Sequence, residues 1–119
     1  MTHPQIWTPT QADFDTFARL SGDDNPIHVD PEFSARTRFG RTVSHGMLLY
    51  SRLWAMLRAA YPAQQAQVTE MMFPNPAFAG EPLRLTLEDR GESIDMRAAR
   101  VADGAPCFQG RAVDRKRHV

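Results

Sequence analysis

One short segment of the sequence, residues 21–30, holds an acid and an imidazole among turn-forming residues. Asp23 and His28 lie five positions apart, on either side of Pro26. Because proline lacks a backbone N–H and disfavours helical conformation in the preceding residue, we predict that residues 23–28 form a loop and not a helix. An imidazole titrates near neutral pH while a carboxylate stays charged, so the pair is able to hold and polarise one water molecule. The alternative is an ordinary turn, since Asp, Asn, Gly and Pro are common turn residues.

A second segment places Ser44, His45 and Gly46 directly before a long apolar stretch. The first N–H groups of a helix have no intrahelical partner and carry partial positive charge. Glycine allows another molecule to approach its main chain closely. An N–H at Gly46 is therefore suited to stabilise negative charge on a carbonyl oxygen, as in an oxyanion hole. The structural alternative is that Gly46 only lets the helix pack and that His45 caps it or fills space.

Two other kinds of chemistry are less well supported by the sequence. A metal site formed by His28, Asp30 and His45 is one alternative, but Asp30 precedes Pro31, and this pair is typical of a helix start. We therefore predict no metal site. The single cysteine, Cys107, excludes an intrachain disulfide and lies in a predicted strand with no histidine nearby in sequence. We expect it to be a buried apolar side chain and not a nucleophile.

The rest of the chain predicts the elements that position these segments. Thr10 and Asp13 have the spacing of a capping box, and Gly22 suits a helix C-cap. The stretch before Pro62 is apolar nearly all round, which indicates a buried helix. We expect helices over residues 10–20, 31–37 and 47–61.

Period-two alternation after the last helix predicts half-buried strands. Leu83, Leu85 and Leu87, for example, alternate with polar residues. We expect strands over residues 67–73, 83–88, 93–101 and 107–113, with an extended segment or short strand within residues 1–9. The fold class is therefore α+β, with an antiparallel sheet following one buried helix. A small sheet leaves its edges exposed, which favours a homodimer.

Composition limits the classes of partner. The 119 residues suit one domain, 1–119, and the 14 basic and 14 acidic residues cancel. This balance gives no support for a nucleic acid or an anionic membrane as partner. No signal peptide or membrane-spanning segment is recognisable, and we expect a cytoplasmic protein.

Several of these motifs together resemble the hydratase-2 signature of MaoC-like dehydratases. The resemblance covers residues 10–113 and rests on four stretches: Leu20-Ser21-Gly22-Asp23-Asp24-Asn25-Pro26-Ile27-His28-Val29-Asp30, Phe39-Gly40, Val43-Ser44-His45-Gly46-Met47-Leu48, and Phe73-Pro74-Asn75-Pro76 with Gly80-Glu81-Pro82-Leu83. It implies a hot-dog fold, in which an antiparallel sheet wraps around a long central helix. It also implies (R)-specific hydration of trans-2-enoyl-CoA to (R)-3-hydroxyacyl-CoA, or the reverse dehydration.

The resemblance assigns roles residue by residue. Asp23 and His28 match the catalytic acid and histidine, and Gly46 matches the glycine whose N–H binds the thioester oxygen. Asn25 and Ser44 are candidates for orienting the pair, and a turn role for Asn25 is the alternative. The implied partner is an acyl-CoA or acyl-carrier-protein substrate, with no cofactor beyond the CoA thioester itself.

Three other functions remain open: a 3-hydroxyacyl-carrier-protein dehydratase, a hot-dog acyl-thioesterase, and a non-catalytic module that binds acyl thioesters. Thioesterases of this fold generally place a carboxylate on or near the central helix. No Asp or Glu occurs between Glu32 and Glu70, which disfavours that alternative.

Overall fold

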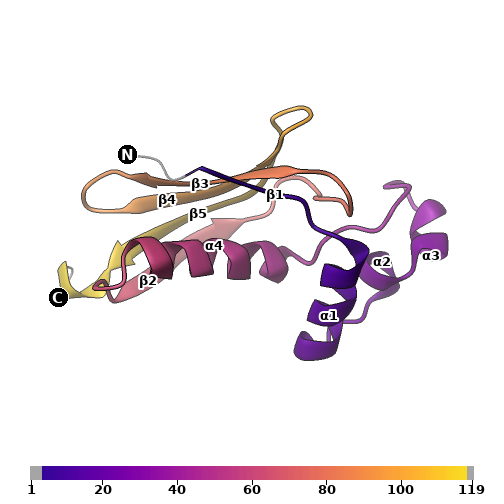
Figure 1. The fold of residues 1–119 in the computed structure, drawn as a ribbon, viewed down its shortest axis with the longest axis horizontal. Coiled ribbons are helices and arrows are strands. Elements are labelled where there is room, and N and C mark those ends of the chain that lie inside the picture. The colour runs from indigo at the N-terminus through magenta and orange to yellow at the C-terminus, as the bar shows by residue number, and fades with distance from the viewer. Residues whose placement is uncertain (1–3, 118–119) are drawn as a thin grey trace.

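The structure, a computed structural model, describes residues 4–117 and is built on one antiparallel five-stranded sheet (Figure 1). The strand order is β1-β3-β4-β5-β2, so β1 and β2 form the two edges. The predicted strands are all present, and the ends predicted for the last four differ from the observed ones by at most one residue: β1 (Gln5–Trp7), β2 (Ala66–Met72), β3 (Leu83–Asp89), β4 (Ile94–Arg100) and β5 (Pro106–Asp114).

The period-two pattern determines which face of the sheet is buried. Leu83, Leu85 and Leu87 are fully buried, and the last two pair across the β3–β4 ladder with Ala98 and Met96. A left-handed glycine, Gly104, lies in the connection between β4 and β5.

The long helix α4 (Gly46–Ala60) lies along the buried face of the sheet (Figure 1). Leu49, Leu53 and Leu57 recur every four residues and form the buried stripe that packs on the strands. The expectation of a helix buried all round is wrong for this chain, because Ser51 and Ala55 on the opposite side are exposed. This fold, a sheet against a long helix, is the predicted α+β layout.

Three shorter helices, α1 (Gln11–Ser21), α2 (Pro26–Val29) and α3 (Pro31–Ala35), gather near the N-terminal end of α4 (Figure 1). The capping box of α1 is formed as predicted, by reciprocal bonds between Thr10 and Asp13, and Gly22 ends the helix in a left-handed conformation. Asp30 caps α3 by accepting hydrogen bonds from two main-chain N–H groups.

The prediction that residues 23–28 contain no helix is wrong in its second half. Helix α2 begins at Pro26 and includes His28, while residues 23–25 remain outside the helices. The physical reason is that proline is favourable at the first helical position, where an N–H would be unpaired anyway. Asn25 supplies the cap, its Oδ1 accepting from Ile27 N–H at 3.1 Å.

None of the helices within residues 4–117 is long and apolar enough to cross a membrane.

Candidate active site

His28 projects from the single turn of α2, and one of its ring nitrogens is fixed by the main chain. Nδ1 lies 2.8 Å from the carbonyl oxygen of Val43. A carbonyl oxygen only accepts, so Nδ1 must carry the hydrogen and donate it. In the neutral ring, Nε2 is then an unprotonated acceptor and is available as a base.

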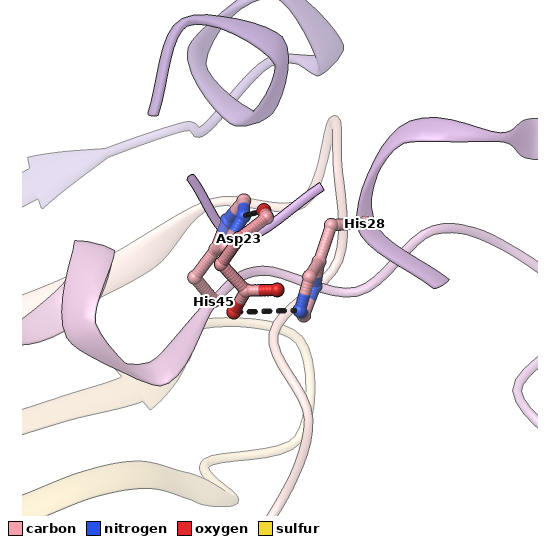
Figure 2. Close-up of side chains that lie close together, drawn as sticks. All are labelled: Asp23, His28 and His45. Atoms are coloured by element: carbon pink, nitrogen blue, oxygen red, sulfur yellow. Dashed lines mark hydrogen bonds and ion pairs between the residues drawn. The ribbon is translucent and has the colours of Figure 1, made fainter. Parts of the chain in front are cut away.

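Asp23 follows the glycine that ends α1, and its carboxylate is half-exposed. Its Oδ2 lies 3.7 Å from His28 Nε2, and Figure 2 shows the carboxylate directed toward that ring. The separation is too long for a direct hydrogen bond. It suits one water molecule that donates its two hydrogens to two acceptors, the carboxylate and the unprotonated imidazole nitrogen, which leaves a lone pair of the water free to attack.

His45 is the third side chain of this cluster, and the sequence assigned it no catalytic role. Its ring stacks on that of His28, with centroids 3.9 Å apart and an interplanar angle of 24°. Its Nε2 lies 2.8 Å from the carbonyl oxygen of Asp23, so Nε2–H is the donor. The motif Ser44-His45-Gly46 was visible in the sequence, but nothing local indicated that His45 would turn back toward residue 23.

The electrostatic environment of His45 favours the neutral ring. The side chain is buried, and this burial lowers the pKa of His45 below its ordinary value, an effect that the hydrogen bond to Asp23 partly offsets. Its Nδ1 is buried without a hydrogen-bond partner among the described residues.

Most contacts of the two residues expected to orient the pair are with main-chain groups. The Asn25 side chain caps α2, and its backbone N–H lies 3.5 Å from Asp23 Oδ1. Ser44 Oγ donates to the carbonyl oxygen of His45 at 2.9 Å, and Ser44 N–H donates to the carbonyl oxygen of Ala77. Apart from the Asn25 N–H, which reaches the Asp23 carboxylate, these contacts fix the loop and the entrance to α4.

Gly46 is the first residue of α4, where its N–H has no intrahelical partner. No side chain caps this helix end. A Cβ at Gly46 would meet the ring of Phe73 at 2.7 Å. Glycine at this position therefore allows Phe73 to lie over the beginning of the helix.

These groups share one open pocket of about 380 Å³. Its polar side is formed by Asp23, His28, Ser44, His45 and Gly46. The remaining lining is mostly apolar: Met47, Leu49, Phe73, Asn75, Pro76, Ala77 and Cys107. A second hollow of about 350 Å³ lies over β2, β4 and β5, but its charged residues include the ion-paired Glu70, Asp95 and Arg111, and it holds no imidazole.

The potential metal ligands in the described chain are Asp23, His28 and His45, whose ligand atoms lie within 4.8 Å of one another. Asp30, which the sequence had suggested for a metal site, instead caps α3. Ligand lone pairs lie in the plane of each imidazole, so two stacked rings direct them side by side and not toward a common ion. The geometry therefore fits an acid–base pair better than a chelate.

Cys107 lies in the pocket wall but is a poor nucleophile. It is almost completely buried, and burial raises the pKa of its thiol. The thiol lies 3.4 Å from the carbonyl oxygen of Pro76, to which it donates.

A family model described as a MaoC like domain matches residues 2–105. The chain belongs to the MaoC-like family. The resemblance drawn from the sequence motifs is thereby confirmed, and the segment that carries Asp23, His28 and Gly46 lies inside the matched region.

Relatives with named activities match about two thirds of this MaoC-like chain. The (R)-specific enoyl-CoA hydratase of Aeromonas caviae is 37% identical over 79 residues, covering 65% of this chain and 59% of the relative. The 3-hydroxybutyryl-CoA dehydratase of Methylorubrum extorquens is 32% identical over 88 residues, covering 72% of this chain and 56% of the relative. The chain thus spans less than two thirds of the length of these relatives.

The fold comparison extends further than the sequence comparison. The solved (R)-hydratase from A. caviae, described as involved in PHA biosynthesis, superposes with a TM-score of 0.82 at 29% identity, covering 95% of this chain and 92% of that one. The predicted hot-dog fold is confirmed by this likeness.

Proposed function

We propose that this MaoC-like chain catalyses the (R)-specific hydration of trans-2-enoyl-CoA to (R)-3-hydroxyacyl-CoA, and the reverse dehydration. One observation carries the proposal: a carboxylate and an unprotonated imidazole nitrogen, 3.7 Å apart, line the same pocket as the N-terminus of α4. The named activities of the relatives support the reaction class.

The first step of the proposed reaction is attack of water on C3. Conjugation with the thioester makes C3 electrophilic, and the attack moves an electron pair toward the carbonyl oxygen. Asp23 and His28 hold the water and remove one of its protons as the C–O bond forms. General base catalysis of this kind contributes about 10²–10⁴-fold.

The second step returns the proton to C2. The carbonyl oxygen carries the negative charge of the enolate, and the N–H of Gly46, at the positive end of α4, donates to it. When the enolate collapses, the proton held by the Asp23–His28 pair is delivered to C2. The pair ends in its original protonation state, so the atoms of one water are added and nothing else is consumed.

The assay for this proposal uses the purified protein and crotonyl-CoA. We expect the absorbance of the conjugated enoyl thioester to fall while no free thiol appears, because hydration removes the double bond and keeps the thioester. Chiral analysis of the product should give the (R)-3-hydroxy form. Release of CoA without loss of the double bond would instead indicate a thioesterase, and no reaction of either kind would leave only acyl-thioester binding.

A homodimer is part of the same proposal, as is a cytoplasmic location. Edge strand β2 pairs with β5 on one side only. At its end, Met72 and Phe73 are exposed, as is Met47 nearby on the wall of the pocket. A second copy seated on this edge would cover apolar surface and close the open side of the pocket.

A further inference from the structure

His45 is enclosed by side chains from two helices, α1 and α2. Its side chain is 2% exposed. The rings of Phe14 and Phe17 on α1 pack on it edge-on, with centroids 6.4 Å and 4.9 Å away, and the ring of His28 stacks on it from α2. His45 therefore lies between the apolar side of α1 and the base of the proposed reaction.

The hydrogen bonds of His45 determine its tautomer. Nε2 donates to the Asp23 carbonyl, and the buried Nδ1 has no partner among residues 4–117. A second proton on Nδ1 would be buried without an acceptor, which is costly. The ionisable groups that face the ring are His28 and Asp23, while α1 presents only Phe14 and Phe17. The lowered pKa of His45 agrees with a ring that stays neutral.

We propose that His45 is a positioning residue for the hydration reaction: as a neutral imidazole, it anchors the Asp23 main chain and supports the ring of His28 by stacking. The proposal rests on the function proposed above. Neither contact involves the substrate, so His45 acts only through the two catalytic groups.

Each contact has a separate consequence for the catalytic pair. Asp23 lies in a loop with a half-exposed side chain, and its carbonyl is held to the helix-entry segment by His45 Nε2–H. His28 is held at Nδ1 by Val43, and His45 supports the face of its ring. Displacements of about 1 Å in such a pair can cost about 10²-fold in rate.

Two substitutions separate these contacts. His45→Phe keeps an aromatic ring against His28 but removes the donor to the Asp23 carbonyl. His45→Gln keeps an N–H donor at a similar distance from the backbone but removes the ring. We expect both to lower kcat for crotonyl-CoA, by up to about 10²-fold, while KM changes little.

Phe17, which packs on the His45 ring from α1, provides a packing control. Phe17→Leu loosens the apolar contact on His45 and leaves both catalytic contacts in place, so it should lower the melting temperature but keep kcat near that of the unmodified protein. The proposal is overturned if the two His45 variants keep kcat, or if Phe17→Leu loses as much kcat as they do.

The state of the His45 ring can be measured without catalysis, so the role proposed for His45 can be tested apart from the hydratase function. Imidazole ¹⁵N NMR, with the His45 signals assigned by their loss in His45→Gln, should show one neutral tautomer with the hydrogen on Nε2. That tautomer should persist at pH values below the ordinary histidine pKa of 6.5. Protonation of His45 at or above that pH, or a hydrogen on Nδ1, contradicts the proposal even if the protein hydrates crotonyl-CoA. Inactivity of the unmodified protein contradicts the proposed function, while the NMR result still decides the state of His45.

Discussion

The two ring nitrogens of His28 differ in their surroundings, and this difference determines what the residue can do. Nδ1 donates to Val43, so the nitrogen that faces Asp23 is the basic one. A hydrogen bond from one nitrogen thus selects the tautomer that suits a general base at the other. The sequence identified the pair, but the carbonyl that orients it comes from residue 43, fifteen positions away.

The donor role of Gly46 is testable with a matched pair of variants. Both Gly46→Ala and Gly46→Pro add a Cβ that would meet the Phe73 ring at 2.7 Å, but only proline removes the N–H. Proline is also tolerated at the first helical position, and His45, with φ −58° and ψ 137°, already has the extended conformation that a following proline requires.

We therefore expect Gly46→Pro to lower kcat by about 10²–10³-fold more than Gly46→Ala does, the cost of losing one oxyanion donor. Steady-state hydration of crotonyl-CoA measures the difference, and circular dichroism checks that α4 remains. Equal kcat values for the two variants would show that the Gly46 N–H does not stabilise the enolate.

The long helix and the strands could be predicted from sequence patterns. Helix α2 and the contact that joins the loop after α1 to the entrance of α4 could not. Alternation in β3 and the four-residue spacing of leucines in α4 are local signals that survive in the structure. Helix α2 was missed because a proline and an asparagine fit both a loop and a helix start. The contact of His45 with residue 23 was missed because it joins segments 22 positions apart, and such pairing has no local signal.

This link between the loop after α1 and the entrance to α4 predicts how stability depends on pH. Burial lowers the pKa of His45 in the folded protein below its ordinary value of 6.5. Below pH 6.5 the unfolded chain therefore binds a proton that the folded chain does not. The free energy of unfolding should be unaffected by His45 above that pH and should fall as the pH drops toward the lowered folded-state value.

Urea unfolding of the unmodified protein and of His45→Gln, at pH 7.5 and at pH 5.0, checks this sign. Between pH 7.5 and pH 5.0 the free energy of unfolding should fall more for the unmodified protein than for His45→Gln, because the variant has no imidazole at position 45 to take up a proton on unfolding. A larger loss in His45→Gln would mean that His45 is not held neutral in the folded state.

In the whole molecule, edge strand β2 of the sheet has no neighbouring strand on its outer side. Met72 is 57% exposed at the end of edge strand β2. A charge at such an edge opposes strand pairing between copies. If the proposed homodimer pairs through this edge, Met72→Lys should sediment as a monomer in sedimentation velocity and lose activity as the pocket opens.

Val101→Lys is the matched control, because Val101 is similarly exposed, at 46%, but lies in the connection between β4 and β5 and not on β2. It should sediment as the unmodified protein does. An unmodified protein that is monomeric at micromolar concentration, or a Met72→Lys variant that stays dimeric, would exclude pairing through this edge.

Asp23 and His28 are proposed to act as one unit on a water molecule, and a double-mutant cycle measures the coupling between them. Asp23→Asn keeps the shape of the side chain, and His28→Asn keeps a donor near the Val43 carbonyl while removing Nε2. With crotonyl-CoA, each single variant should lose about 10²–10⁴-fold in kcat. The double variant should lose little more than either, because residues that act together are non-additive. Losses that multiply in the double variant, or a single variant with near-normal kcat, would mean that the two residues do not act as a unit.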